Sequence, residues 1–350
     1  MATEPLDKLT TDLKDLGELP ITSSKHSSLR VTHRAERSFY TVVVHVITRR
    51  FRNFMGRPKK QQPKGSIQLK PHKIILRTCT VSERRVEDIY VYDIKPRNIK
   101  GNDFDKRIYY FCGGGWQSPP SGQHWQLAAK LARQMPRTTI SIVSYPLAPN
   151  NAAPVAFPML MKLYRTLLQQ SVDEGHRLVF AGDSSGANVV LSLVLEALRE
   201  DETNATIASQ PQTNHPVAIM LISPSTDLTR SNPDIERRAP FDPILTPDFV
   251  KSTAKAWCGD WDPTDRRVSP LNADIGLLAK RRIRCHGITG GYDILGPDAV
   301  LLRDRLEEES VGGEWLEWDK QMHCFVLTWP YGLHEAREGV GWMVDVLKKD

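Results

Sequence analysis

Ser184 is the residue whose surroundings most clearly suggest chemistry, because it is the serine of a Gly-x-Ser-x-Gly pattern at residues 182–186. Glycines on both sides allow a turn so tight that the serine hydroxyl stands clear of the backbone, as in a nucleophile elbow. The apolar run 177–180 before the pattern predicts a strand, and the apolar run 189–198 after it predicts a helix. The amino terminus of that helix would stabilise negative charge developing next to the hydroxyl. The pattern and its flanks therefore predict a catalytic nucleophile.

By itself the pattern is weak evidence, since a chain of this length contains about 0.1 such matches by chance. A Gly/Ser turn without any chemistry is the alternative explanation. A nucleophilic serine needs a general base, an acid that orients the base, and hydrogen-bond donors for the oxyanion. The rest of the chain must supply these three parts.

Donors for an oxyanion are predicted at three consecutive glycines, Gly113, Gly114 and Gly115, which directly follow the apolar run 108–111. Such a run is poor in both strands and helices, but it lets the backbone approach a ligand and direct N–H groups at it. A second donor is expected from the residue after the nucleophile, which is Ser185. A flexible glycine turn is the alternative.

The general base is expected to be a histidine that follows a late strand. His323 lies between the predicted last strand, 315–318, and the predicted final helix, 335–349. Two other histidines fit less well. His334 begins that helix and reads as a surface or capping residue, whereas His286 lies inside an apolar strand and reads as a core residue.

The acid is expected to lie between the serine and the histidine in chain order. Asp293 follows the predicted strand 283–287 and satisfies this condition. Asp298 is the alternative acid, although it also suits a charge at the start of a helix. The order Ser184, Asp293, His323 is one of the known orders of a Ser-Asp-His triad.

Alternating strands and helices from about residue 71 predict an α/β fold with a mostly parallel central sheet and helices on both faces. Residues 74–76 and 86–94 are predicted to be a pair of strands joined by the charged turn 82–85. The other predicted strands are 108–111, 139–144, 177–180, 217–222, 283–287 and 315–318, and the predicted helices are 121–135, 156–170, 189–198, 297–308 and 335–349. Ligands bind beyond the carboxyl ends of such strands, and each candidate side chain directly follows one.

Two segments interrupt this alternation. Residues 1–70 are expected to be an irregular helical N-terminal arm, with an amphipathic spacing of leucines over residues 7–19. Residues 226–280 are rich in Pro, Asp and Trp and read as an insertion into a domain that spans residues 71–350.

The net charge of +6 is unevenly placed, because residues 1–77 hold 16 of the 47 Lys/Arg and 6 of the 41 Asp/Glu. Without a base-reading motif, this split argues against nucleic-acid binding. A solvated basic segment, or peripheral contact between the basic arm and a membrane surface, explains it better. The apolar run 39–47 is too short to span a bilayer.

The five cysteines have neither metal-ligand spacing nor the pattern of a disulfide framework. No apolar segment typical of a signal peptide occurs over residues 1–20. We therefore expect reduced thiols, no metal and a cytoplasmic protein. The oligomeric state is left open.

Six stretches, taken together, resemble the hormone-sensitive-lipase-like branch of the α/β-hydrolases, which comprises the bacterial family IV esterases and their fungal relatives. The resemblance runs from about residue 105 to the end of the chain. It rests on Cys112-Gly-Gly-Gly, Tyr145-Pro-Leu-Ala-Pro, Gly182-Asp-Ser-Ser-Gly-Ala-Asn, Asp262-Pro-Thr-Asp-Arg-Arg-Val-Ser-Pro, Gly291-Tyr-Asp-Ile-Leu and His323-Cys-Phe, in the family order. It implies an α/β-hydrolase fold with a helical cap built from the arm and the insertion. Trp257, Trp261, Phe241 and Phe249 would then line or brace a lid over Ser184, or simply pack.

The chain departs from the family pattern at three positions. Cys112 replaces the histidine that braces the glycine loop, which puts the rigidity of the loop in question but removes no donor. Cys324 replaces a glycine after the catalytic histidine. Ser185 replaces an alanine and keeps its backbone N–H.

The expected function is cleavage of a small to medium hydrophobic carboxylic ester through an acyl-enzyme, without metal or organic cofactor. The resemblance leaves two alternatives open. One is a tailoring hydrolase or acyltransferase of fungal secondary metabolism, and the other is a non-catalytic ligand-binding member of the fold.

Overall fold

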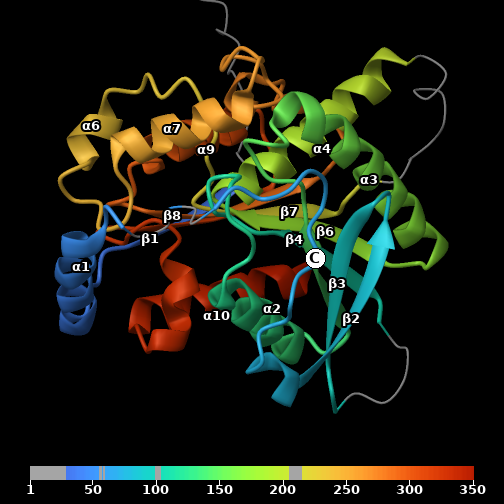
Figure 1. The fold of residues 1–350 in the computed structure, drawn as a ribbon, viewed down its shortest axis with the longest axis horizontal. Helices are drawn as coiled ribbons and strands as arrows, with labels where there is room; N and C mark the ends of the chain where they lie inside the picture. The colour runs from blue at the N-terminus through green and yellow to red at the C-terminus, as the bar shows by residue number, and fades with distance from the viewer. Residues whose placement is uncertain (1–28, 55–56, 58–59, 99–103, 205–214) are drawn as a thin grey trace, which may run out of the picture.

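The computed structural model describes residues 29–54, 57, 60–98, 104–204 and 215–350, which form one mixed sheet with helices on both sides (Figure 1). The order of the sheet is β1-β9-β8-β7-β6-β4-β5-β3-β2. Its strands are β1 (Leu29–Arg34), β2 (Cys79–Val86), β3 (Ile89–Pro96), β4 (Lys106–Phe111), β5 (Thr138–Ser144), β6 (Arg177–Asp183), β7 (Ala218–Ile222), β8 (Arg284–Gly290) and β9 (Gly313–Trp318).

Most of the sheet is parallel, and only the pairs β2–β3 and β3–β5 are antiparallel. The central strands β4, β5 and β7 are buried along their whole length. The sequence of β7 is apolar throughout, as expected for a parallel strand covered on both faces, whereas β4 begins with Lys106 and Arg107 and β5 includes buried Thr and Ser. The expected α/β class and mostly parallel sheet are confirmed.

Helices α2 (Gly122–Gln134) and α10 (His334–Lys349) cover one face of the sheet, and α3 (Ala153–Asp173), α4 (Ser185–Thr203) and α9 (Gly296–Glu308) cover the other (Figure 1). Each face encloses its own apolar core. Between β7 and β8 the chain forms α6 (Asp234–Arg238), α7 (Pro247–Cys258) and α8 (Gly276–Lys280). No helix in the described residues has the length and hydropathy needed to cross a lipid bilayer.

The predicted first hairpin is wrong in its details. Residues 74–76 do not form a strand, because Ile75–Arg77 is a short 3-10 helix. The strands of the hairpin are β2 and β3, and its turn lies at Glu87 and Asp88, with φ angles of 48° and 62°. The charged residues 82–85, predicted to be a turn, lie within β2. They fit there because β2 is an edge strand, where charged side chains reach solvent and prevent further pairing.

The expected helical arm is also wrong for residues 29–34. These residues form β1, which pairs in parallel with β9 at the edge of the sheet. Leu29 and Val31 on one side of the strand pack against the core, whereas Arg30 and Thr32 on the other side are exposed. The helix α1 (Phe39–Phe51) follows, and the Ser38 side chain caps it by accepting the N–H of Thr41. The amphipathic stretch at residues 7–19 lies outside the described residues.

Candidate active site

Ser184 lies at the turn between β6 and α4 with φ 53° and ψ −119°, a conformation that is rare for any residue other than glycine. Its N–H donates to the carbonyl of Ile222 at 2.8 Å, which ties the turn to β7. Only glycine fits at position 186, since a Cβ there would lie 2.0 Å from the carbonyl oxygen of Phe111. The predicted elbow is therefore present, and its spacing has a steric cause.

A continuous chain of hydrogen bonds joins the three residues of the predicted triad. The His323 Nε2 atom lies 2.9 Å from Ser184 Oγ, and its Nδ1 atom lies 2.8 Å from Asp293 Oδ2. The other oxygen of Asp293 accepts the N–H of Leu295 at 2.8 Å, which fixes the carboxylate. The three side chains follow β6, β8 and β9, so the carboxyl edge of the sheet brings them together.

Burial and a neighbouring charge have opposite effects on the pKa of His323. Asp293 is fully buried and His323 nearly so. Burial alone would lower the pKa of His323, but the adjacent Asp293 carboxylate outweighs it and raises this pKa well above its ordinary value. The imidazolium that forms during a proton transfer would therefore be strongly stabilised.

The alternative candidates have partners elsewhere. The carboxylate of Asp298 accepts a hydrogen bond from Asn232 at 2.7 Å, and burial raises the pKa of Asp298 to about 6. His334 is exposed and pairs with Glu338 at 2.6 Å. His286 is buried, and its Nδ1 atom accepts the N–H of Glu314 at 3.0 Å.

The glycine loop requires one change to the predicted oxyanion hole. The N–H of Gly113 donates to Asp183 Oδ1 at 3.0 Å, so this donor is already occupied. The N–H groups of Gly114, Gly115 and Ser185 have no hydrogen-bond partner among the described residues. A Cβ at position 113 would lie 2.3 Å from Asp183, which explains the glycine.

The sequence analysis missed a second buried Asp–His pair beside Ser184. Asp183 Oδ1 lies 3.1 Å from His124 Nε2, and it also accepts hydrogen bonds from the hydroxyl of Tyr110 and the N–H of Gly113, both at 3.0 Å. Burial would raise the pKa of Asp183, but His124 and these donors outweigh it and lower this pKa. Two features of the sequence could have indicated this pair. Asp183 directly precedes Ser184, and His124 lies at the start of the helix that follows the glycine loop.

Two contacts stabilise the loop despite the missing histidine. The carbonyl of Cys112 accepts a hydrogen bond from the hydroxyl of Tyr145 at 2.8 Å, and the N–H of Gly113 donates to Asp183.

Cys324 has φ 51°, which is a conformation that glycine adopts more readily, and its N–H donates to Ser223 Oγ at 3.0 Å. This left-handed backbone is a physical reason for a glycine at this position in related sequences.

Ser184 and His323 line a cavity of about 310 Å³. Its apolar lining residues are Ile244, Leu245, Phe249 and Leu327, and its polar ones include Ser118, Ser121, Gln123 and Thr328. Arg57 also lines it, with its guanidinium 5.7 Å from the centre of the Phe249 ring. The cavity is therefore largely apolar, with polar groups near the glycine loop and one cation.

Of the four aromatic residues expected at a lid, Phe249 alone lines this cavity. Trp257 stacks on Trp116 at 5.8 Å between ring centres, and Trp261 packs against Phe157 at the same distance. Phe241 stacks on Tyr292, the residue before Asp293, at 5.5 Å. These three residues therefore brace neighbouring elements by packing.

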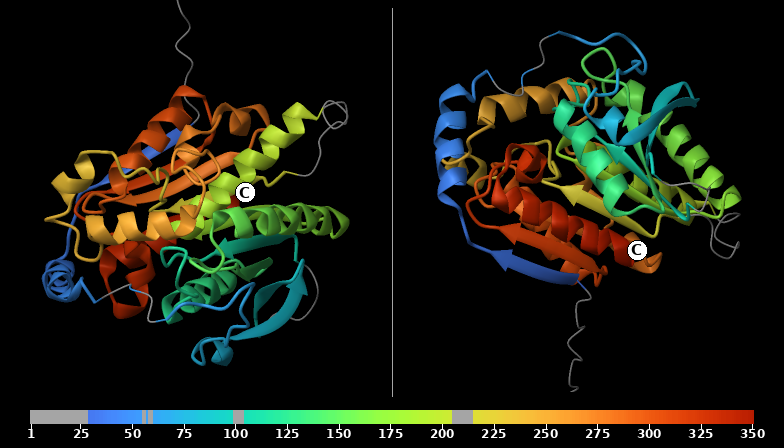
Figure 2. Two further views of the ribbon diagram at one scale, coloured as in Figure 1. Left: turned by 45° about the horizontal axis from the view of Figure 1, so that its top comes forward. Right: turned by 90° about the horizontal axis from the view of Figure 1, so that it is seen from below.

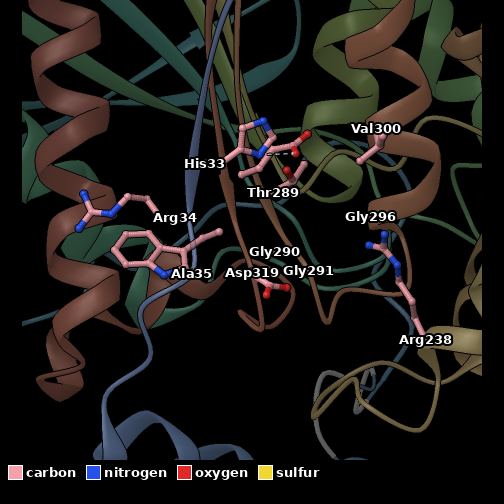
Figure 3. Close-up of a pocket in the computed structure, with 12 residues that line it drawn as sticks. His33, Arg34, Ala35, Arg238, Thr289, Gly290, Gly291, Gly296, Val300 and Asp319 are labelled. Carbon is pink, nitrogen blue, oxygen red and sulfur yellow. Dashed lines mark ion pairs between the residues drawn. The ribbon is translucent and has the colours of Figure 1, made fainter.

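A second cavity of about 340 Å³ has Thr289, Gly296 and Val300 among its lining residues (Figure 3). Strand β1, the end of β9 and Arg238 surround it, with Gly290 and Gly291 in its wall (Figure 3). Neither Ser184 nor His323 lines it. The cavity that contains both is therefore the candidate active site.

A family model described as the alpha/beta hydrolase fold matches residues 108–327. This match spans more than half of the 350 residues and includes the glycine loop, the elbow, Asp293 and His323. The chain belongs to the alpha/beta hydrolase family.

Relatives within this family carry names of ester-cleaving enzymes. A protein of Acinetobacter venetianus named Esterase is 28% identical over 230 residues, which cover 64% of this chain and 70% of that protein. A protein of Mycobacterium tuberculosis named as the acetyl-hydrolase LipR is 31% identical over 238 residues, which cover 67% of this chain and 70% of that protein.

Solved structures resemble the whole fold. An esterase from the bacterial hormone-sensitive lipase family superposes with a TM-score of 0.71 at 21% identity, covering 90% of this chain and 99% of the other. An esterase/lipase from an uncultured bacterium gives a TM-score of 0.69 at 20% identity, covering 89% and 99%. The predicted α/β-hydrolase fold is thereby confirmed.

Proposed function

We propose that this alpha/beta hydrolase cleaves carboxylic esters through an acyl-enzyme on Ser184. The observation that carries the proposal is the unbroken hydrogen-bond chain from Asp293 through His323 to the Ser184 hydroxyl. The class itself, a carboxylic-ester hydrolase, agrees with the names of its relatives. The role of each residue and the nature of the ester are the proposal.

In the acylation step, His323 Nε2 accepts the proton of Ser184 Oγ as this oxygen attacks the ester carbonyl. Asp293 keeps the proton of the imidazole on Nδ1 and stabilises the imidazolium. The tetrahedral oxyanion accepts hydrogen bonds from the N–H of Ser185 and from Gly114 or Gly115, whose N–H groups lack other partners among the described residues.

His323 then gives its proton to the departing alcohol, and the acyl group stays on Ser184. In deacylation the same imidazole accepts a proton from water, which attacks the acyl-enzyme and releases the acid. All of these proton transfers use one nitrogen, which lies 2.9 Å from the serine oxygen.

A small to medium hydrophobic ester fits the cavity best. The apolar side chains of Ile244, Leu245, Phe249 and Leu327 would contact the acyl or alcohol part of the ester, and a volume of about 310 Å³ limits its size. The first three belong to the 226–280 insertion, and Arg57 belongs to the N-terminal segment. We therefore assign the 226–280 insertion and the stretch around Arg57 to a cap over the catalytic domain, to whose sheet β1 also belongs.

Turnover distinguishes this proposal from a ligand-binding role. Purified protein should hydrolyse p-nitrophenyl acetate and butyrate and react with a fluorophosphonate probe, and Ser184→Ala should abolish both. Ligand binding without turnover in the parent protein would contradict the proposal. Adding a competing alcohol separates hydrolysis, which gives the acid, from acyl transfer, which gives a new ester.

A further inference from the structure

Helix α1 exposes an apolar surface that no described element covers. Six large apolar side chains in this helix and just after it are each at least 51% exposed. We call them the α1 apolar face, and they are Phe39, Tyr40, Val46, Ile47, Phe51 and Phe54. Their spacing places them on one side of the helix. Figures 1 and 2 both show α1 at the outer edge of the molecule.

The opposite side of α1 is anchored to the protein, so the exposure is not due to a detached helix. The hydroxyl of Thr41 donates to the buried Glu335 carboxylate at 2.6 Å. The buried His45 lies against Tyr292, with 6.4 Å between the ring centres. Near the end of the helix, Arg49 donates to the carbonyl of Phe241 at 2.6 Å. The helix is therefore oriented with its apolar face outward.

The charged residues of α1 and of the flanking sequence are almost all basic. Helix α1 contains no acidic residue, and Arg49 and Arg50 occupy its last turn. Residues 29–77 contain 13 Lys/Arg and one Asp/Glu. An apolar helix face flanked by basic side chains is the composition that binds at the interface of an anionic lipid layer.

The segment that follows α1 contacts the elements that line the candidate active site. Arg52 donates to the carbonyl of Ala239 at 2.8 Å, in the same loop whose Ile244 and Leu245 line the cavity. Arg57, six residues after the end of α1, lines the cavity as well. A surface that covered the α1 apolar face would therefore lie near segments that line the cavity.

We propose that the α1 apolar face docks the enzyme onto an anionic lipid surface, so that esters dissolved in that surface enter the cavity directly. The substrate part of this statement rests on the proposed esterase function, whereas the docking does not. A second copy of the chain is the competing occupant, but the unpaired positive charge around the face favours a surface of opposite charge.

The test measures binding of the full chain to phosphatidylglycerol–phosphatidylcholine vesicles by flotation. We expect binding that disappears with pure phosphatidylcholine and weakens in high salt. The double variant Ile47→Glu/Phe51→Glu should bind at least about tenfold more weakly, because each buried Ile or Phe side chain contributes a factor of this order. Arg50→Ala, which leaves the apolar face intact, should weaken binding about fivefold.

The matched control is Val155→Glu/Val172→Glu, which places two charges on exposed aliphatic positions of α3. It should bind vesicles as the parent protein does. Equal binding by the parent and by Ile47→Glu/Phe51→Glu, or no binding of the parent to anionic vesicles, would overturn the proposal. Concentration-dependent self-association that the same double variant abolishes would assign the face to a second copy, which also overturns it.

Hydrolysis of p-nitrophenyl acetate without vesicles separates the two proposals. The α1 variants should keep this activity, because none of the substituted residues lines the cavity. Turnover without vesicle binding would reject the docking alone, and vesicle binding without turnover would reject the esterase function alone.

Discussion

Two buried Asp–His pairs flank Ser184, and they differ in which ring nitrogen carries the proton. In His124, Nδ1 accepts the N–H of Ser121 at 2.9 Å, so its proton lies on Nε2, which faces Asp183. In His323, Nδ1 faces Asp293 and Nε2 faces the serine hydroxyl. Both ring nitrogens of His124 contact groups other than Ser184, whereas Nε2 of His323 faces the Ser184 hydroxyl.

This difference shows that an Asp–His pair beside a serine is not in itself a catalytic base. The role of the histidine depends on what its other ring nitrogen contacts. The Asp183–His124 pair holds the glycine loop through the N–H of Gly113, and Asp183 also accepts the thiol of Cys324, the residue after His323, at 3.8 Å. We therefore regard His124 as a positioning residue and His323 as the base.

The largest expected effect is the loss of the nucleophile or of the base. Ser184→Ala and His323→Ala should each lower kcat by about 10⁴–10⁶, because each removes the proton-transfer chain entirely. The double variant should be no slower than either single variant, since the residues act as a unit. Steady-state hydrolysis of p-nitrophenyl butyrate measures this, and additive losses in the double variant would contradict a shared mechanism.

Asp293→Asn should have the next largest effect and lower kcat by about 10³–10⁴. The asparagine no longer favours the tautomer with the proton on Nδ1 and no longer stabilises the imidazolium. It also removes the charge that raises the pKa of His323. Since the base must be neutral, kcat/KM of the parent should rise with pH through this raised pKa, and the rise should occur at lower pH in the variant.

A pH profile of kcat/KM for the parent protein and Asp293→Asn checks this shift. Asp298→Asn is the matched control in the same segment, and its profile should coincide with that of the parent. An unchanged profile in Asp293→Asn would show that Asp293 does not set the pKa of the base.

His124→Ala should have an intermediate effect, lowering kcat by about 10–100 while changing KM less. The substitution leaves the buried Asp183 without its imidazole partner, so the Gly113 N–H and the donors after it lose their alignment. His124→Gln, which retains a donor, should recover part of the loss. Kinetics with p-nitrophenyl acetate and butyrate give both parameters.

His286→Ala is the control for His124→Ala. His286 is also buried, accepts a backbone N–H at Nδ1, and faces a carboxylate, that of Asp350, at 3.3 Å from Nε2. It lies on β8, and its contacts do not include the active site. It should lose stability without a comparable loss of kcat. An equal fall in kcat for both variants would show that the effect of His124→Ala is general destabilisation.

Asp298→Asn should give the smallest effect on activity and a gain in stability. Burial raises the pKa of Asp298 from 3.8 to about 6, so ionisation costs folding energy that is absent below pH 4, grows between pH 4 and 6, and is complete above pH 6. Asparagine avoids this cost, which amounts to about 2–3 kcal/mol. Thermal unfolding at pH 8 should show the gain, and unfolding at pH 4 should not.

The sequence predicts a triad of Ser184, Asp293 and His323, and each of these residues follows a strand. Parallel strands present their carboxyl ends at one edge, and the sheet order β9-β8-β7-β6 places the strands that precede Ser184, Asp293 and His323 close together. The hairpin of β2 and β3 is harder to predict. Charged residues are typical of turns, yet on an edge strand they face solvent at no cost, and only the sheet order identifies β2 as an edge.

The pairing of β1 with β9 is a contact that the local sequence of β1 does not predict. Its partner β9 begins at Gly313, so the pairing depends on the rest of the domain having folded. The outward direction of the α1 apolar face depends in the same way on Glu335 and Tyr292, which anchor the other side of the helix.

The sequence by itself determined the tight turn at Ser184, the glycine loop and the chain order of the acid and the base, because glycine spacing and strand ends act on the local backbone. The tertiary structure decided which donors stay free. Gly113, Gly114 and Gly115 are equivalent in sequence, but the carboxylate of Asp183 lies close to the first of them and takes its N–H. Hydrogen-bond partners depend on which side chains packing brings near, and spacing along the chain does not specify that.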